Sequence, residues 1–146
     1  MTRLDREQIA RLIPHAGSMC LLDSVESWDS TSIRCLSWRH LSKDNPLRGP
    51  KGLGVLSGVE FAAQAMAVHS RLSAGSESRP TAGYLMSLRD VKCRNLCFSE
   101  LDRELLIHAN LLMGDEKQAV YTFAVGCADT ELISGRAAVI LEAGRR

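Results

Sequence analysis

The chain has 146 residues, and a chain of this length is typically one domain that buries roughly two-thirds of its unfolded surface. A hydrophobic content of 45%, a charged content of 24% and a net charge of +1 are ordinary for a soluble globular protein and give no sign of a nucleic-acid partner. The N-terminus is charged from its first residues, and no apolar run is long enough to span a membrane.

The five cysteines are scattered and form no Cys-x-x-Cys pair. Because an odd, dispersed set of cysteines fits neither a disulfide framework nor a zinc site, we expect reduced thiols in a cytoplasmic protein without a metal site. No internal repeat or linker divides the chain, so we predict a single domain over residues 1–146.

The first third of the chain alternates short apolar segments with breakers. A helical spacing ends at Pro14, and Asp29 with Ser30 indicates a turn between two alternating patterns. The predicted elements are, in order, a helix over 4–12, strands over 19–25 and 33–38, and a loop over 41–54 that is rich in glycine and proline.

Residues 55–72 form the one long run that is apolar nearly all the way around a helix. A helix of this kind must be surrounded by other structure rather than laid on a surface. Four of its residues are alanines, so a sheet can close tightly around it. The run contains a single carboxylate, Glu60, and the nearest cation within the run is Arg71.

The rest of the chain shows period-two patterns joined by short turns, which are typical of an antiparallel meander. The predicted strands cover 84–92, 105–113, 120–128 and 132–141. One antiparallel sheet curled around one apolar helix satisfies this order, so we predict the α+β class. Such a sheet keeps open edges, and we therefore expect dimerisation at an edge or beside the helix.

Three motifs in this order resemble those of a known family. They are Leu12-Ile13-Pro14-His15 followed by Met19-Cys20-Leu21-Leu22-Asp23, then Glu60-Phe61-Ala62-Ala63-Gln64-Ala65, and then Ala82-Gly83 through Val91-Lys92. The chain resembles the hotdog-fold 3-hydroxyacyl-ACP dehydratases of the FabZ/FabA type over about residues 10–141. A divergent branch, the dehydratase-like proteins of aryl polyene pathways, is more similar than the housekeeping enzymes.

The resemblance implies a hotdog fold and the dehydration of an acyl thioester carried on phosphopantetheine, with no cofactor of the protein's own. In the family, a histidine in a loop before the central helix is the base, and the helix acid assists the departing hydroxyl. The equivalent stretch of this chain, residues 45–52, contains no histidine. The fold therefore follows from the resemblance more directly than the activity does.

Glu60 is the candidate acid, because a carboxyl group in an apolar pocket favours its neutral form and can then donate a proton. The alternative is a Ser-x-x-Glu capping box, in which Ser57 and Glu60 only satisfy helix amides. By resemblance, the backbone at Gly54, Ser57 and Gly58 would bind the thioester, where the helix dipole favours negative charge.

Further site candidates flank Glu60. Gln64 lies one turn on and would orient Glu60, contact substrate or bond across a dimer seam. Phe61 would line an apolar acyl tunnel or belong to the core. His15 is the candidate replacement base, with a structural role in its loop as the alternative.

The other histidines and the cations are weaker candidates. We expect His40 at the surface, His69 on the helix face opposite Glu60, and His108 solvated on a strand. Five cations would receive the phosphopantetheine arm or an acidic carrier protein, or else are merely solvated. They are Arg48, Lys51, Arg89, Lys92 and Arg94.

Three functional hypotheses follow. The first is a 3-hydroxyacyl-ACP dehydratase that acts on a carrier-protein or CoA thioester, and the second is an acyl thioesterase, in which the helix carboxylate activates water. The third is a non-catalytic subunit that completes a heterodimer with a histidine-bearing paralogue. The missing loop histidine is the feature that indicates the third.

Overall fold

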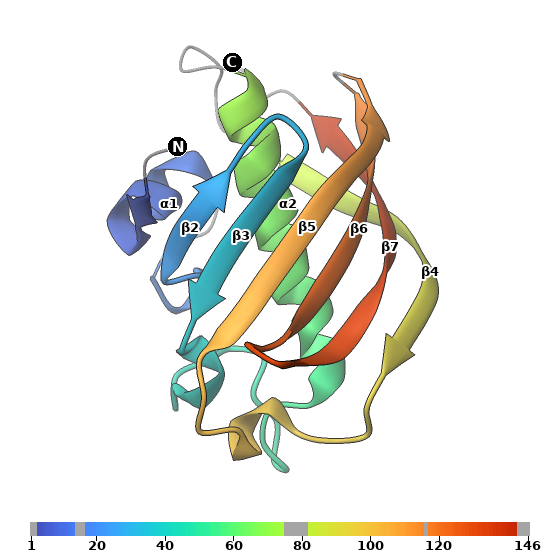
Figure 1. Cartoon of the computed structure of the whole chain (residues 1–146). Coiled ribbons are helices and arrows are strands. Elements are labelled where there is room, and N and C mark those ends of the chain that lie inside the picture. Colours follow the sequence, from blue (N-terminus) through green and yellow to red (C-terminus); the bar gives the residue numbers. More distant parts are fainter. Residues whose placement is uncertain (1–2, 14–16, 75–81, 116, 143–146) are drawn as a thin grey trace.

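The computed structural model describes residues 3–13, 17–74, 82–115 and 117–142. Within them, one seven-stranded antiparallel sheet curls around one long helix, α2 (Gly58–Ala74) (Figure 1). Before α2 the chain forms β1 (Leu4–Asp5), α1 (Arg6–Leu12), β2 (Ser24–Trp28) and β3 (Ser32–Ser37). After α2 it forms β4 (Ala82–Cys93), β5 (Leu105–Gly114), β6 (Gln118–Cys127) and β7 (Thr130–Glu142). Four 3₁₀ turns accompany them within the described residues, namely η1 (Gly17–Met19), η2 (Arg39–Leu41), η3 (Val55–Ser57) and η4 (Phe98–Glu100).

The strand order is β1-β2-β3-β5-β6-β7-β4. Strands β5, β6 and β7 form a meander as predicted, but β4, which was predicted as its first strand, pairs with β7 instead of β5. Strands β3 and β4 lie far apart because α2 carries the chain across the sheet between them (Figure 1). This crossover places α2 on the concave side of the sheet, and β4 becomes an edge strand.

The core lies between α2 and the inward faces of the strands. Phe61 of α2 is fully buried and meets Phe98 edge-on, with ring centroids 6.3 Å apart and an interplanar angle of 81°. Burial of an aromatic or leucine side chain of this kind stabilises a fold by roughly 1.5–3 kcal/mol. The α+β class and the helix-wrapped hotdog sheet are therefore confirmed. No helix in the described ranges has the length and apolarity that crossing a membrane requires.

The predicted strand over 19–25 is wrong in its first half. The chain there forms η1 and an extended segment, and β2 begins only at Ser24. The reason is that side chains occupy the backbone groups of Leu21: its N–H donates to Gln64 Oε1, and its carbonyl accepts from Ser37 Oγ. An apolar alternation cannot distinguish a backbone partner from a side-chain partner.

The two edges of the sheet differ sharply. One edge is the two-residue β1, and the other is the twelve-residue β4. Four large apolar side chains of β4 are exposed in the single chain: Leu85 (41%), Met86 (54%), Leu88 (39%) and Val91 (37%). A long, apolar, uncovered edge strand is a surface that proteins normally pair or cover.

Candidate functional site

Glu60 lies in the first turn of α2 and is exposed. Its carboxylate makes no hydrogen bond and no ion pair within the described residues. It is therefore free to meet a ligand or a second chain. A catalytic role for Glu60 stays a prediction.

The capping box between Ser57 and Glu60 is not formed. The 3₁₀ turn η3 precedes α2, so Gly54 is the residue at the start of the helical segment and Ser57 lies inside it. Ser57 Oγ donates to the Gly54 carbonyl at 2.5 Å instead of accepting from an amide of α2. The alternative explanation for the acid is thereby removed.

The backbone before Glu60 is tightly bonded within the chain. The N–H of Ser57 donates to the Gly54 carbonyl at 3.1 Å, and the N–H of Gly58 donates to the Val55 carbonyl. These two amides are thus engaged, and thioester binding by Gly54, Ser57 and Gly58 stays a prediction. Gly58 has a clear packing role, because a Cβ there would lie 2.7 Å from Ile133 Cγ2 and 3.1 Å from the Phe98 ring.

Gln64 clamps the segment that precedes β2 to α2. Its amide is buried (4% exposed), with Oε1 accepting the Leu21 N–H at 2.8 Å and Nε2 donating to the Met19 carbonyl at 2.7 Å. Both ends of the amide are hydrogen-bonded within the chain. This role differs from the three expected from the sequence, which were to orient Glu60, to contact substrate or to bond across a dimer seam. The arrangement holds residues 19–21 against α2 one turn from Glu60.

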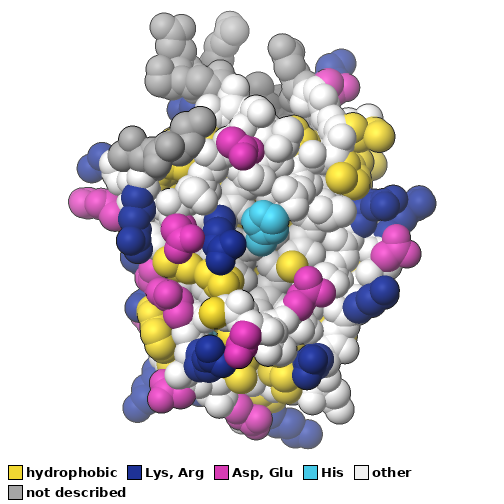
Figure 2. All heavy atoms as spheres, viewed as in Figure 1, with side chains coloured by type: hydrophobic (Ala, Val, Ile, Leu, Met, Phe, Trp, Pro, Cys, Tyr) yellow, Lys and Arg dark blue, Asp and Glu magenta, His cyan; other side chains and the backbone are white. Residues whose placement is uncertain are grey.

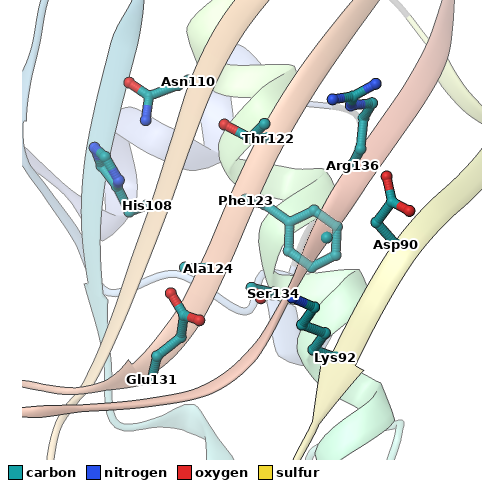
Figure 3. A pocket seen from close by; sticks show the side chains of 11 residues that line it. Asp90, Lys92, His108, Asn110, Thr122, Phe123, Ala124, Glu131, Ser134 and Arg136 are labelled. Atoms are coloured by element: carbon teal, nitrogen blue, oxygen red, sulfur yellow. The ribbon is translucent and has the colours of Figure 1, made fainter.

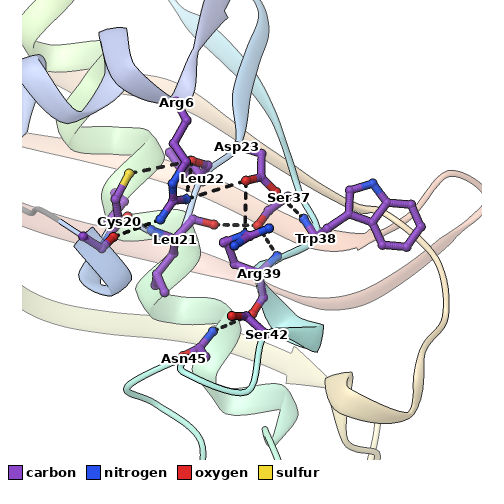
Figure 4. Close-up of polar contacts among 12 residues, drawn as sticks. Arg6, Cys20, Leu21, Leu22, Asp23, Ser37, Trp38, Arg39, Ser42 and Asn45 are labelled. Atoms are coloured by element: carbon purple, nitrogen blue, oxygen red, sulfur yellow. Dashed lines mark hydrogen bonds and ion pairs between the residues drawn. The ribbon is translucent and has the colours of Figure 1, made fainter.

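Two further side chains fix the same segment (Figure 4). Arg6 donates to the carbonyls of Gly17 at 2.9 Å and Leu22 at 3.3 Å, and Ser37 Oγ donates to the Leu21 carbonyl at 2.5 Å. Residues 17–22 are therefore held from α1, β3 and α2 together. His15 lies just before them, outside the described residues, so its predicted role as a base stays a prediction.

Asp23 forms ion pairs with two arginines beside this segment (Figure 4). Its Oδ1 lies 3.1 Å from Arg39 Nε and 3.6 Å from Arg6 Nη1, and its Oδ2 accepts the Trp38 N–H at 2.7 Å. A hollow of about 230 Å³ lies next to them and is also lined by Asp44. Because two carboxylates face the two guanidinium groups, the hollow has no excess of positive charge to attract an anion.

Phe61 belongs to the core in the single chain, which is the alternative that the sequence left open. Its ring is fully buried against Phe98, so contact with an acyl chain would require a cavity that reaches the core. Substrate contact by Phe61 stays a prediction.

The expectation that His40 lies at the surface is wrong. The ring is fully buried, its Nε2 donates to the Leu101 carbonyl at 2.9 Å, and it stacks on Trp38 with centroids 6.3 Å apart. Burial lowers the pKa of His40, although the hydrogen bond to Leu101 partly opposes this. Its Nδ1 is buried and has no hydrogen-bond partner within the described residues.

His69 and His108 lie where the sequence predicts. His69 is fully buried on α2, with Nε2 donating to the Asp29 carbonyl at 2.9 Å and Nδ1 2.8 Å from Tyr121 Oη. Tyr121 Oη lies a further 3.1 Å from Ser70 Oγ, and burial raises the Tyr121 pKa. His108 is exposed on β5. None of these three described histidines is hydrogen-bonded to Glu60.

A second hollow, of about 380 Å³, lies on the outer face of the sheet and includes His108 (Figure 3). It forms where Ala124, Ser134 and Gly135 leave space between longer side chains. Glu60 lines neither this hollow nor the one beside Asp23. Within the described ranges, no group of three or more His, Cys, Asp or Glu side chains is placed to hold a metal ion.

Comparisons with known proteins bear on this arrangement. The solved dehydratase heterocomplex ApeI:P from Xenorhabdus doucetiae contains a chain similar to this one, with a TM-score of 0.79, 27% identity, and coverage of 92% of this chain and 90% of that one. A mutant thioesterase from Pseudomonas aeruginosa matches with a TM-score of 0.65 and 14% identity, covering 96% and 95%. AziG of S. sahachiroi matches with a TM-score of 0.61 and 16% identity, covering 92% of this chain and 100% of that one. The last two likenesses show the fold alone.

No curated protein sequence matches the chain. The family of ApeP dehydratases, described as ApeP-like, matches residues 7–143, which is nearly the whole chain. A match of that extent, together with the helix-wrapped sheet, leads to one conclusion: the chain belongs to the ApeP-like dehydratase family.

Proposed function

We propose that this chain is one subunit of a heterodimeric dehydratase that removes water from a 3-hydroxyacyl thioester, and that Glu60 is its catalytic acid. The observation that carries the proposal is the free carboxylate of Glu60, which is exposed at the start of α2 and has no partner within the described residues. A carboxylate whose role is to stabilise a helix end would be bonded there, as the capping box predicted.

The reaction requires two proton transfers. A base takes a proton from the carbon beside the thioester carbonyl, the electron pair forms the new carbon–carbon double bond, and the hydroxyl leaves from the next carbon as water. Glu60 in its neutral form would donate the proton that completes that water molecule. Covering Glu60 with a partner subunit would favour the neutral form, because burial disfavours the charged form of a carboxyl group.

The base is a separate question. His15 is our candidate, supported by the clamp of Gln64, which holds the nearby residues 19–21 against α2 one turn from Glu60. The loss of a general base typically slows an enzyme by a factor of about 10² to 10⁴, so the absence of the family's loop histidine need not abolish turnover. A histidine of the partner subunit would serve equally.

The uncovered edge of β4 supports the heterodimer. Leu85 pairs with Val139 and Leu88 pairs with Ala137, and both partners are buried, so the two leucines face the α2 side of the sheet. Their exposure of 41% and 39% means that this side is open in the single chain. A strand added to β4 would cover them, and the similar chain of the ApeI:P heterocomplex was solved with a partner dehydratase.

The substrate would be a carrier-protein or CoA thioester of aryl polyene synthesis.

The test is the Glu60→Gln variant, assayed with a 3-hydroxyacyl carrier protein after mixing with the ApeI-type dehydratase of the same source. We expect water loss, measured by mass, to slow by about 10² to 10⁴. Thermal stability and heterodimer formation should remain unchanged, because Glu60 has no partner in the chain. An unchanged rate would overturn the catalytic role.

A second candidate function, the non-catalytic subunit, is favoured by the absence of histidine from residues 45–52. It predicts that the mixture is active and that Glu60→Gln leaves this activity intact. The thioesterase alternative is distinguished in the same assay, because it would release a free acid and a free thiol rather than an unsaturated thioester.

A further inference from the structure

Two arginines face each other at the β4 edge of the sheet. Arg89 of β4 stands directly opposite Arg136 of β7 in the strand register, and both side chains are exposed. Neither makes a hydrogen bond or ion pair within the described part of the chain. Like charges directly opposite on one face of a sheet destabilise the pairing. The chain therefore keeps an unfavourable pair at its open edge.

The charges around this pair do not balance it. Lys92 lies opposite Ser134, Arg94 follows the end of β4, and both are exposed. The only acidic residue from 85 to 94 is Asp90, which sits in a bulge of β4 with a φ of 54° and makes no ion pair. Glu131 of β7 is exposed and lines the same outer hollow as Asp90, Lys92 and Arg136. Four cations and these two anions give the region a net charge of +2.

The figures show where the strip lies. In Figure 3, Arg136, Asp90 and Lys92 line the β4 side of the outer hollow. In Figure 2, dark blue Lys and Arg spheres, with magenta acidic spheres among them, lie along the right margin of the same face, where Figure 1 places β7 and β4. The strip therefore adjoins the edge to which the proposed partner would add a strand.

A second copy of this chain is a poor match for the strip. A strand paired with β4 lies about 4.8 Å away, and facing side chains approach to roughly 5 Å. A second β4 would bring the same excess of positive charge to that distance. Only one acid per copy, Asp90, would face the three cations that each copy contributes from residues 89–94.

We propose that this basic strip (Arg89, Lys92, Arg94 and Arg136) recognises a partner edge strand that carries acidic side chains on its outer face. Charge then selects the heterodimer over the homodimer. This inference rests on the proposed function, because it takes the partner to be a second dehydratase subunit, and it adds the chemistry by which that subunit is chosen.

The test measures heterodimer affinity by calorimetry for the full chain and the ApeI-type dehydratase of the same source. We expect Arg89→Glu and Arg136→Glu each to weaken the heterodimer by about tenfold or more, because like charges across an interface are strongly unfavourable. Lys117→Glu is the matched control, since Lys117 is exposed in the β5–β6 turn, and the one charge recorded as interacting with its side chain is that of Asp115 in the same turn. It should change the affinity by less than about twofold.

The thermal stability of the isolated chain should change in the opposite direction to the affinity of the heterodimer. Arg89→Gln removes the repulsion from Arg136, so it should raise the melting temperature of the isolated chain while weakening the heterodimer. Arg89→Glu should also increase self-association in ultracentrifugation. A merely structural role for Arg89 would shift stability and affinity in the same direction.

The outcomes separate the two proposals. If the wild-type chain forms no heterodimer, the proposed function fails and this inference fails with it. If the heterodimer forms but Arg89→Glu and Arg136→Glu behave like Lys117→Glu, only the inference is overturned. The inference is also overturned if Arg89→Glu and Arg136→Glu weaken the binding of an acidic carrier protein and leave the affinity for the partner subunit unchanged. The basic strip would then bind the carrier protein and not the partner strand.

Discussion

The polar residues on the buried side of α2 are hydrogen-bonded within the chain, whereas Glu60 on the exposed side is not, among the residues that the structure describes. On the buried side, Gln64 bonds to two backbone groups at 2.7 and 2.8 Å, and His69 bonds to Asp29 and Tyr121 at 2.9 and 2.8 Å. On the exposed side, Glu60 has no hydrogen bond within the described residues. The fold thus uses the polar side chains of Gln64 and His69 and does not use that of Glu60.

This difference separates polar side chains that the fold needs from one that the fold does not need. A buried polar group left without a partner costs about 1–3 kcal/mol, so the fold must satisfy Gln64 and His69. An exposed carboxylate costs the fold little, so the stability of the single chain does not depend on a partner for Glu60. Substitutions on the two sides of α2 should therefore affect different measurements.

The largest stability effect is expected for Gln64→Leu. The substitution removes both hydrogen bonds and leaves the Leu21 N–H and the Met19 carbonyl without partners, which should lower the free energy of unfolding by about 2–4 kcal/mol. Glu60→Ala is the control and should stay within about 0.5 kcal/mol. Chemical denaturation measures both. Equal effects of the two substitutions would contradict the distinction between the two sides.

A smaller effect is expected at Gly58, at the junction of the two sides. Gly58→Ala places a Cβ 2.7 Å from Ile133 Cγ2, and overpacking of this kind typically costs about 1–3 kcal/mol. Gly54→Ala is the matched control, because a Cβ at Gly54 meets nothing within 4 Å. Thermal unfolding of both variants checks this. A neutral Gly58→Ala would show that the start of α2 moves easily away from β7.

The Tyr121→Phe substitution probes the buried network of His69. It removes the hydroxyl group that lies 2.8 Å from His69 Nδ1 and 3.1 Å from Ser70 Oγ, without changing the ring that packs on α2. We expect a loss of about 1–2 kcal/mol in the free energy of unfolding and no change in dehydratase rate. A change in rate without a change in stability would instead assign the network to the site.

The fold could be predicted from the sequence to a large extent, because it depends on periodicity. The apolar run over 55–72 became η3 and α2, and the four alternating segments after it became β4 to β7. The alternation over 19–25 misled because its backbone bonds to the side chains of Gln64 and Ser37. Those contacts join residues 43 and 16 positions apart, which local pattern does not report.

The site could be predicted only in part. The motif placed Glu60 near the start of the central helix, where the structure has it, and its catalytic role stays a prediction. The expected cap by Ser57 failed because η3 shifted the helical start to Gly54. The sequence also did not reveal that Arg89 faces Arg136, because that register depends on two bulges in the β4–β7 pairing. Burial of His40 was missed for a similar reason: its partner, Leu101, is 61 residues away.

His40 sharpens the comparison with His69, because it is a buried histidine with one nitrogen unsatisfied among the described residues. Burial lowers its folded-state pKa below the ordinary value of 6.5, so the unfolded state binds the proton first as pH falls. The stability linked to His40 is therefore present above pH 6.5 and is lost as pH falls through the folded-state pKa, at up to about 1.4 kcal/mol per pH unit. His40→Gln, which keeps a donor for Leu101, should flatten this part of the pH–stability curve. Identical slopes for the two proteins below pH 6.5 would assign the acid sensitivity to other groups.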